Sequence, residues 1–577
     1  MTILNQVEKA SQDTLNEIFK CIDSQQHFLL EAGAGAGKTY SLIKTLNYLI
    51  DKNGNLYQER TQKIACITYT NVAKDEILSR IDSNPIVFCE TNHAFCWSLI
   101  SQFQKQLREL IPQIQEWKTK LEDYSGTICD KNIIYDLGYR SIKENELSLH
   151  HDDVIFLTIK LLENSKFRQI ISEKYPVILI DEYQDTDKDW IEAIKIQFLC
   201  SDISPLFGFF GDHWQKIYGN GCGLIEHKNI RKIDKKINFR SNQLIISSLN
   251  KIRENLPQYP KDESLDGSIH IFHTNNWNVT RQTSAHWKGD LSDVDSKTAF
   301  EIVKSELSNK GWQFEHEKTR ILMLTHKLLA NAQGYSELAK LFKYNESFIK
   351  KENKYISFFI DKLEPACEAF IQKKYGVMFD ILGQKKPLLL NHLDKIKWQE
   401  DMNKLIQLRE SGTVGDIIRL LQETSKPRLP DYILNKESQL LKLDSSSEQE
   451  LLPDFRELKN LHSISYLEII ALKKYLDQHS PFQTQHGVKG AEFENILIVI
   501  GRGWNKYNFG EMLKWVKEGI PNGKQDTFER YRNLFYVACS RPKKHLAILF
   551  TQELDNSAMD TVEEWFGQAN IFALKQE

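Results

Sequence analysis

The segment Glu31–Thr39, with the sequence EAGAGAGKT, has the residue types and spacing of a loop that binds phosphate groups. Its small residues allow backbone N–H groups to close around phosphate oxygens. The candidate phosphate-contacting residues are Ala32, Gly33, Ala34, Gly35, Ala36, Gly37 and Lys38. The Lys38 ammonium is expected to reach the β- and γ-phosphates, and the Thr39 hydroxyl is expected to hold Mg²⁺. A flexible Gly/Ala turn is the alternative interpretation, and the intact Gly-Lys-Thr after an apolar run argues against it.

A second segment, VILIDEYQD at Val177–Asp185, is an apolar run that ends in two acids. Such a strand end can supply a second Mg²⁺ contact, Asp181, and a base, Glu182, that polarises an attacking water. On its own, Asp-Glu after a strand is common in solvated loops. Its place after a phosphate loop in one α/β pattern favours hydrolysis of a nucleoside triphosphate.

Short apolar runs recur along the chain and are expected to form the strands that position these loops. They lie at His27–Leu30, Lys63–Thr68, Val177–Ile180, Leu206–Phe210, Ile269–Phe272, Ile321–Leu324, Ile496–Ile500 and Leu546–Phe550. Runs that are apolar on both faces suit buried strands of parallel sheets. Helical patterns follow many of them, for example at Tyr40–Ile50 and Asn71–Ile81. The alternation predicts a doubly wound α/β fold.

Two long segments interrupt this alternation, Ser98–Asp153 and roughly His326–Ser480. Both are rich in charged and apolar residues at helical spacing, so we expect mostly helical insertions within α/β domains. The residues His150–Asp153 could be drawn as a metal cluster. A helix start with Asp as its cap is the preferred interpretation, because no further ligands are spaced to complete a metal site.

Composition narrows the class of protein. The 577 residues and 67.4 kDa predict several domains. Hydrophobic residues make up 41% and charged residues 27% of the chain, as in ordinary globular proteins. The net charge of -3 is unlike that of a dedicated basic DNA-coating protein, although a basic groove on an acidic protein is compatible with it.

The nine cysteines form no CxxC pair, which argues against a zinc ribbon or an iron–sulfur cluster. Buried free thiols in a reducing setting are expected instead. No stretch has the length of a membrane span, and the first residues lack the pattern of a secretory signal. We therefore expect a cytoplasmic protein with no membrane partner.

The motifs, taken in order, resemble those of the UvrD/Rep branch of superfamily one helicases. The resemblance rests on AGAGAGKT (Ala32–Thr39), TYTNVAKDEILSRI (Thr68–Ile81), TNHAFCWSLI (Thr91–Ile100), DEYQD (Asp181–Asp185), GDHWQKIYG (Gly211–Gly219), NFRS (Asn238–Ser241), TQHGVKGAEF (Thr484–Phe493) and RNLFYVACSR (Arg532–Arg541). Each motif alone is weak to moderate, whereas the ordered set is specific. It implies an ATP hydrolase and DNA helicase with ATP and Mg²⁺ as cofactors.

The resemblance also assigns roles around the nucleotide. It implies that Gln215 senses the γ-phosphate and that Arg240 and Arg541 act on it as arginine fingers. The further residues expected at the nucleotide are Phe239 against adenine, Glu492, and a specifying glutamine for which Gln12 and Gln6 are both candidates.

The same resemblance implies a track of single-stranded or tailed DNA. The candidate DNA contacts are Tyr69, Thr70, Asn71, His93, Tyr218, Thr484 and His486. Aromatic faces among them would stack on bases, each contributing roughly 1–3 kcal/mol. For Phe95 and Trp214, stacking on DNA and burial in the core are both open. Asn220 stands where the family has a stacking Trp, which weakens one base platform.

The implied architecture is two RecA-like P-loop lobes with parallel sheets, each carrying a mostly helical inserted subdomain. The first lobe would comprise residues 1–97 and 154–234, with residues 98–153 inserted. The second would comprise 235–325 and 481–577, with 326–480 inserted. By family resemblance, ATP bound between the lobes would drive movement along DNA in the 3′ to 5′ direction.

The compact build also resembles the helicase-like subunit of the Gabija antiphage system. Only 36 residues follow Arg541, so we expect any nuclease or effector to be a separate protein. Phage defence and DNA repair are both compatible pathways. One alternative is a nucleic-acid-sensing ATPase that activates a partner without processive unwinding. Another is a non-catalytic scaffold with a degenerate site, against which the intact Lys38, Glu182 and Arg541 argue.

Overall fold

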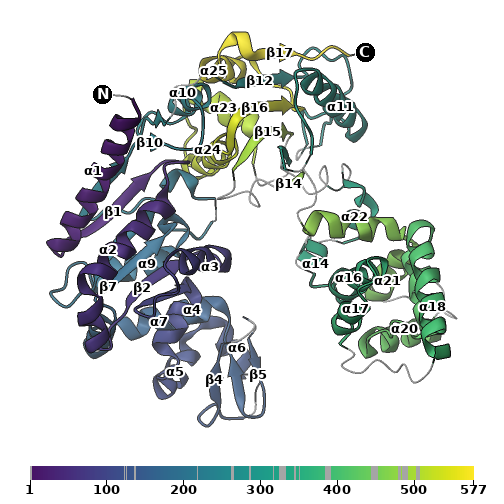
Figure 1. Ribbon diagram of the computed structural model, residues 1–577, viewed down its shortest axis with the longest axis horizontal. Helices are drawn as coiled ribbons and strands as arrows, with labels where there is room; N and C mark the ends of the chain where they lie inside the picture. Colours follow the sequence, from purple (N-terminus) through teal and green to yellow (C-terminus); the bar gives the residue numbers. More distant parts are fainter. Residues whose placement is uncertain are drawn as a thin grey trace. The chain divides into compact units, whose positions relative to one another are not determined.

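The computed structural model (Figure 1) divides into two compact units. Unit 1 consists of Met1–Ile269, Phe509–Leu546 and Asp555–Asn570, and unit 2 of His270–Asn508, Ala547–Leu554 and Ile571–Glu577. The structure describes residues 3–122, 124, 126–135, 138, 140–217, 219–261, 266–284, 287–315, 317–323, 330, 333–342, 346–349, 351–383, 392–443, 453–477, 482–483, 492–501 and 507–576.

A six-stranded sheet forms the centre of unit 1, in the order β3-β2-β7-β8-β1-β9. Its strands are β1 (His27–Ala32), β2 (Ile64–Thr68), β3 (Val87–Thr91), β7 (Val177–Asp181), β8 (Leu206–Gly211) and β9 (Ile230–Lys235). Every neighbouring pair is parallel. The carboxyl ends of these strands therefore meet at one edge of the sheet, where ligands bind in open α/β folds.

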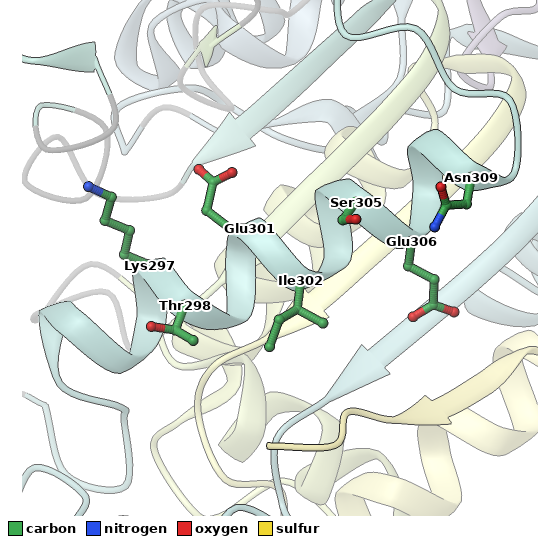
Figure 2. Close-up of a pocket in the computed structure, with 7 residues that line it drawn as sticks. All are labelled: Lys297, Thr298, Glu301, Ile302, Ser305, Glu306 and Asn309. Carbon is green, nitrogen blue, oxygen red and sulfur yellow. The ribbon is translucent and has the colours of Figure 1, made fainter. Parts of the chain in front are cut away.

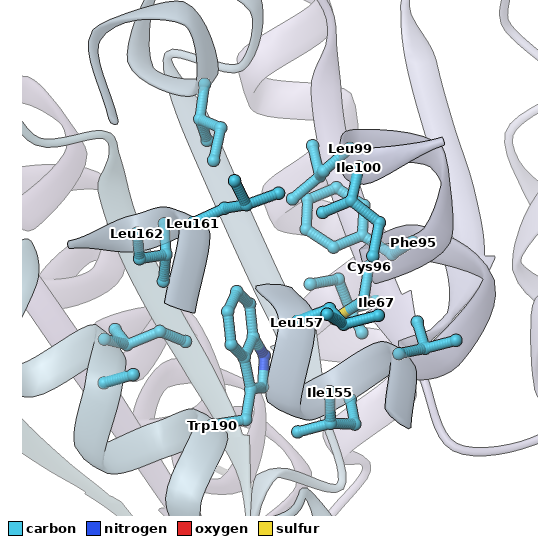
Figure 3. Close-up of a cluster of buried hydrophobic side chains, with 14 of the residues drawn as sticks. Ile67, Phe95, Cys96, Leu99, Ile100, Ile155, Leu157, Leu161, Leu162 and Trp190 are labelled. Carbon is cyan, nitrogen blue, oxygen red and sulfur yellow. The ribbon is translucent and has the colours of Figure 1, made fainter. Parts of the chain in front are cut away.

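Helices cover both faces of this sheet, because successive residues of a buried strand point to opposite faces. Phe28 and Leu30 pack with α1 and α2, whereas Leu29 packs with α4, α7 and α9 on the other face. Figure 3 shows part of the core on the Leu29 face of the sheet, including Phe95 of α4, Leu157 of α7 and Trp190 of α9. The helices of unit 1 around the sheet are α1 (Ile3–Asp23), α2 (Lys38–Glu59), α3 (Asn71–Arg80), α4 (Asn92–Ile100), α7 (His151–Leu162), α8 (Ser165–Lys174) and α9 (Lys188–Gln197).

The later segments of unit 1 contribute a small sheet and further helices. A two-stranded parallel pair joins β10 (Ile237–Asn238) to β11 (Tyr259–Pro260). The helices here are α10 (Gln243–Ile252), α23 (Phe509–Glu518), α24 (Gln525–Cys539) and α25 (Asn556–Phe566). Residues that we predicted in the second lobe thus group with the phosphate loop in one compact unit, and the predicted lobe boundaries stay a prediction.

The segment 98–153 is less helical than we expected. It holds α5 (Gln104–Leu110) and α6 (Gln115–Glu122), but also a three-stranded sheet of β4 (Asn132–Ile134), β5 (Ser141–Ile142) and β6 (Glu146–Ser148). These strands are only two or three residues long, too short to show a period of two in the sequence.

A second six-stranded sheet, in the order β14-β13-β15-β16-β12-β17, belongs mostly to unit 2. Its strands are β12 (Ser268–His273), β13 (Thr319–Met323), β14 (Phe482–Gln483), β15 (Phe493–Ile500), β16 (Pro542–Phe550) and β17 (Ile571–Ala573). One core joins Phe272, Ile321 and Leu497 of this sheet to Phe300 and Val303 of α11 (Asp293–Asn309).

In the sequence, a helical subdomain with its own hydrophobic core is inserted between β13 and β14. Its helices are α13 (Ser336–Leu341), α14 (Glu346–Ile349), α15 (Lys354–Phe358), α16 (Glu364–Ile371), α17 (Tyr375–Ile381), α18 (His392–Ser411), α19 (Val414–Thr424), α20 (Asp431–Leu443), α21 (Pro453–Ser463) and α22 (Tyr466–Leu476). In this core, Arg409 donates to Glu364, which also accepts from the Tyr466 hydroxyl at 2.9 Å.

The predicted fold class is confirmed: the chain is α/β, with two parallel-sheet lobes and inserted subdomains, and the larger insertion is helical. All eight predicted strands are present within a few residues of the expected bounds. Among the described residues, no helix is long and apolar enough to cross a membrane. The cysteines of the described segments are all free thiols, most of them buried.

Candidate nucleotide and DNA site

The phosphate loop connects the end of β1 to the start of α2, as predicted. Gly35 and Gly37 have φ values of +75° and +74°, in the left-handed region that side chains other than glycine rarely adopt. A Cβ atom at Gly35 would also lie 2.5 Å from Oδ1 of Asn238. Backbone conformation and close approach therefore both require glycine here, and the loop leaves the N-terminus of α2 open to an anion.

The segment Asn238–Ser241 holds the phosphate loop from the side. Asn238 donates from Nδ2 to the carbonyl of Ala34 at 2.9 Å, and the backbone N–H of Phe239 donates to the carbonyl of Gly35 at 2.8 Å. The structure therefore places the predicted adenine-stacking residue and the predicted finger Arg240 directly beside the loop. Arg240 donates from Nη1 to the carbonyl of Ser540 at 2.9 Å.

Asp181 and Glu182 lie at the end of β7, two strands from the phosphate loop. Glu182 adopts a left-handed conformation with φ +47° and ψ 46°, which costs a non-glycine residue of order 1–3 kcal/mol and is typical of functional sites. Gln184 donates from Nε2 to Glu182 at 2.6 Å, and its Oε1 accepts from the backbone N–H of Asp212 at 3.0 Å. One amide thus fixes the predicted base relative to the end of β8.

Gln215 and Arg541 are linked to each other and are both buried. Gln215 donates from Nε2 to Asp212 at 2.8 Å, and its Oε1 accepts from Nη2 of Arg541 at 3.3 Å. Arg541 is 1% exposed. Burial and the nearby Arg240 charge lower the pKa of Arg541 to about 9, and Glu182 opposes that shift. The residues predicted to act on the γ-phosphate are therefore electrostatic neighbours within unit 1.

A buried ionic network that sequence reasoning missed connects these groups. Glu31, at the end of β1, accepts from the Tyr183 hydroxyl at 2.6 Å, from Nδ1 of His213 at 2.7 Å and from Nη2 of Arg253 at 3.0 Å. Arg253 also pairs through Nη1 with Asp212 at 2.7 Å. The one sequence signal was an acid at the end of the apolar run HFLLEA, whereas Arg253 lies in no recognisable motif.

The charge of Glu31 is strongly stabilised by its partners. Burial raises its pKa, but the His213 and Tyr183 hydrogen bonds and the Arg253 charge outweigh burial and lower the pKa to about 2. Glu31, Asp212 and His213 each place a ligand atom within 4.8 Å of the others, the spacing of a metal site. Because Arg253 already bridges both carboxylates, its guanidinium supplies the positive charge there. The predicted Mg²⁺ contacts, Thr39 and Asp181, lie outside this cluster.

Helix α24 supplies two more contacts that were not predicted. The Tyr536 hydroxyl accepts from the backbone N–H of Ala34 at 3.3 Å. The Arg532 guanidinium lies 3.7 Å from the centre of the Trp214 ring, on which Arg253 also packs at 5.4 Å. Trp214 is therefore a buried core aromatic that holds the arginines, and base stacking by this ring is not supported.

The candidate DNA segments follow β2 and β3, the two strands at one side of the sheet. Thr68 and Thr91 are register partners, so Tyr69–Asn71 and His93 come from adjacent strand ends. Thr70 caps α3 by accepting from the backbone N–H of Ala73 at 3.2 Å, and the Tyr69 ring is 42% exposed. Two of the predicted DNA segments thus meet at the same edge as the phosphate loop.

Phe95 and His93, which we also considered as contacts to DNA, are less accessible than Tyr69. Phe95 is 1% exposed in the core of unit 1, so it is a core residue. The ring of His93 is half-buried 5.2 Å from that of His151, and burial lowers its pKa.

The segment His150–Asp153 starts α7 as predicted, but His150 is the N-cap and Asp153 completes the capping box from the third position.

Several predicted residues are not part of this assembly or are not described. Tyr218, Thr484 and His486 lie outside the described residues, as does the side chain of Gln6. Gln12 is exposed on α1 and donates to Asn16 at 3.1 Å. Glu492 is an exposed residue of unit 2, just before β15. The assignments of Gln12 and Glu492 to the nucleotide stay predictions.

A surface hollow along α11 in unit 2 carries none of these groups. Figure 2 shows that its lining side chains, such as Lys297, Glu301 and Glu306, come from this single helix. A binding site normally brings polar groups together from several elements. The hollow is therefore not the functional site.

The fold and site define an ATP-hydrolysing enzyme of the P-loop class, with the phosphate loop, two acids, Gln215 and two arginines at one sheet edge. Comparison with known proteins gives the particular kind. Residues 12–136 and 115–238 match the model of the UvrD/REP helicase N-terminal domain. The chain is an ATP hydrolase that is similar to the UvrD/REP DNA helicases.

Three relatives illustrate the range of similarity. The chain is 25% identical to the Gabija protein GajB of Bacillus cereus (strain HuB5-5), over 98% of both chains. It is 24% identical to the ATP-dependent DNA helicase Rep of Buchnera aphidicola subsp. Schizaphis graminum (strain Sg), over 91% of both. It is 22% identical to the ATP-dependent DNA helicase PcrA of Staphylococcus aureus (strain MRSA252), over 90% of this chain and 80% of that one.

Proposed function

We propose that this enzyme uses ATP hydrolysis to move along single-stranded DNA in the 3′ to 5′ direction and to separate tailed duplexes. The observation that carries the proposal is the arrangement of one parallel sheet edge. There the nucleotide groups follow β1, β7 and β8, and the candidate DNA groups follow β2 and β3. Strand β7, which carries Asp181 and Glu182, is the immediate neighbour of β2, so a change at these acids has a short path to the nucleic-acid contacts.

The residues of the site fit ATP and Mg²⁺. Gly35 and Gly37 form a backbone cradle that a Cβ atom would obstruct or strain, as a closely bound triphosphate requires. Thr39 and Asp181 are oxygen donors of the kind that Mg²⁺ prefers. In this proposal Lys38 binds the β- and γ-phosphates, Glu182 orients and deprotonates the attacking water, and Arg240 and Arg541 stabilise charge on the departing phosphoryl group.

We further propose a role in phage defence with a separate effector protein, acting in the cytoplasm where ATP and DNA are present. The end-to-end similarity to Gabija protein GajB supports this pathway over general DNA repair. The effector is expected to bind the helical subdomain of residues 326–480. Co-purification from the native host tests this part, and recovery of the bare chain under mild conditions would contradict it.

The second candidate function is a nucleic-acid-sensing ATPase that activates its partner without processive unwinding. The observation that favours it is Asn220, an exposed residue where the related helicases have a stacking Trp. A missing base platform weakens the grip on each successive base, while single-strand binding can still trigger hydrolysis.

A paired assay separates the two candidates. ATP hydrolysis is measured with and without single-stranded DNA at low and high salt, beside strand displacement on duplexes with a 3′ or a 5′ tail. We expect DNA to stimulate hydrolysis, the stimulation to fade as salt rises, and the 3′-tailed duplex alone to be unwound. Lys38→Ala is the control and should do neither. Stimulation without displacement of either duplex would favour the sensor, and no stimulation at low salt would refute both.

A further inference from the structure

Lys235, the last residue of β9, places a buried ammonium group at the start of α2. The residue is 1% exposed. Its Nζ donates to the Ser41 hydroxyl at 2.8 Å and to the carbonyl of Gly37 at 3.3 Å. Gly37 and Ser41 belong to the junction between the phosphate loop and α2. The charge therefore lies directly beside the expected nucleotide site.

This ammonium has no carboxylate within ion-pair distance among the described residues. Its two acceptors are a neutral hydroxyl and a neutral carbonyl, and burial lowers its pKa to about 8. A buried charge without a counter-ion destabilises a fold. A methionine or leucine would fill the same space without that cost. The presence of lysine at this position therefore indicates a function beyond packing.

Two half-exposed aromatic rings flank the ammonium. Its Nζ lies 5.7 Å from the centre of the Tyr40 ring and 5.5 Å from that of Phe239, and these residues are 48% and 40% exposed. A Cβ atom at Gly37 would lie 3.7 Å from Lys235 Nζ and 3.7 Å from Phe239 Cδ2. The two rings, the Lys235 ammonium and the end of the phosphate loop at Gly37 therefore all border the same small region.

The geometry points to Lys235 as a specificity-determining residue that, with Tyr40 and Phe239, holds the purine base of the nucleotide. This inference rests on nucleotide binding at the phosphate loop and goes beyond the predicted stacking on Phe239. Two of the three ammonium N–H bonds have protein acceptors, which leaves one for an acceptor atom of the base. An ammonium cannot accept a hydrogen bond, so the base must present a ring nitrogen or carbonyl and turn its amino group away.

Lys235→Met tests the inference by removing the charge at nearly constant volume. Nucleotide affinity is measured by calorimetry, with ATP and with inorganic tripolyphosphate, which has phosphates but no base. We expect ATP affinity to fall about 10- to 100-fold, as for loss of a charge-assisted hydrogen bond. Tripolyphosphate affinity should stay within about twofold. The melting temperature of the nucleotide-free protein should rise, because an uncompensated buried charge is gone.

Lys232→Met is the matched control, since Lys232 lies on the same strand with its side chain 55% exposed. It should change neither affinity nor melting temperature. Lys38→Ala should lose both ligands, which separates failure of the phosphate loop from failure of the base contact. Equal losses of ATP and tripolyphosphate in Lys235→Met, or no loss of ATP, would overturn the inference, as would a lower melting temperature.

A second set of measurements leaves the chain intact. The analogues 1-deaza-, 3-deaza- and 7-deaza-ATP each replace one base acceptor with C–H. One of them should bind the wild-type protein about as weakly as ATP binds Lys235→Met, and that analogue identifies the recognised edge. Unchanged affinity for all three would refute the contact. Tyr40→Ala, at an exposed position, should weaken ATP about tenfold through lost stacking and leave tripolyphosphate unchanged.

Discussion

Glu31→Gln should destabilise the protein at neutral pH by an amount that shrinks in acid. The substitution keeps the shape of the side chain at the end of β1 and removes its charge. In the native protein that charge receives hydrogen bonds from Tyr183 and His213 and an ion pair from Arg253. Glutamine leaves the Arg253 guanidinium with Asp212 as its remaining carboxylate partner within unit 1.

The magnitude follows from the pKa of Glu31, which is about 2 in the folded protein against an ordinary value of 4.5. Because the folded pKa is the lower one, ionised Glu31 stabilises the fold above pH 4.5, and this stabilisation is lost as pH falls toward 2. A difference of roughly 2.5 pKa units corresponds to about 3 kcal/mol at pH 7. The same linkage leaves about 1.4 kcal/mol at pH 3.

The assay is urea unfolding of the wild-type protein and of Glu31→Gln at pH 7, 5, 4 and 3. The free energy of unfolding is compared at each pH, so that acid effects common to both proteins cancel. Glu17→Gln is the matched control, because Glu17 pairs with Arg231 at 3.1 Å with both side chains more than two-fifths exposed. An exposed pair contributes about 0–1 kcal/mol, so this control should change little at any pH.

The reasoning would be refuted by a difference between wild type and Glu31→Gln that stays constant from pH 7 to pH 3. Such a result would mean that the cost of the substitution is steric and that the Glu31 charge has no special stabilisation. A wild-type-like stability at pH 7 would likewise show that the network around Arg253 does not favour the ionised carboxylate.

Four further predictions concern the site. Glu182→Gln should bind ATP normally but lower kcat by about 10²–10⁴ through loss of the base, and near-normal turnover would remove Glu182 from that role. Arg541→Lys should lower kcat by about 10³ or more with ATP affinity within a few-fold, since lysine cannot reproduce the guanidinium fork; steady-state kinetics with nucleotide titration decides this. Tyr69→Ala should weaken single-stranded DNA binding by roughly 1–3 kcal/mol, measured by fluorescence anisotropy, and unchanged affinity would make Tyr69 a bystander. Arg253→Met should cost about 3–5 kcal/mol in urea unfolding because it leaves two carboxylates buried, and a loss below about 1 kcal/mol would contradict that account.

The strands that carry the site could be predicted because a strand buried on both faces has a visible apolar run, as at Val177–Ile180. Strand β9 was not predicted, because IRKIDK at the edge of the sheet has only two apolar residues, each followed by two charged ones. Edge strands tolerate such charges, and the sequence contains no continuous apolar run. Strand β3 was also not predicted, although VFCET begins with three apolar residues.

The residues of the site also fall into two groups: some belong to recognisable local motifs, and others depend on partners that are distant in the sequence. The phosphate loop, Glu182 and Gln215 belong to short motifs whose spacing encodes their geometry. Glu31, Arg253 and Lys235 act through partners far away in the sequence, and no local pattern announces which charges will be buried together. Trp214 is the opposite case. Its motif left base stacking open, but in the structure its ring packs against Arg532 and Arg253.

The hydrogen bond from Ala34 to Tyr536 joins residues 502 positions apart. During synthesis on the ribosome, the phosphate loop is therefore made long before the hydroxyl that bonds to it. Folding must therefore close a very long loop before the nucleotide site is finished, which is a slow kind of event. Until α24 has been made, a growing chain therefore holds a phosphate loop that lacks the Tyr536 hydrogen bond.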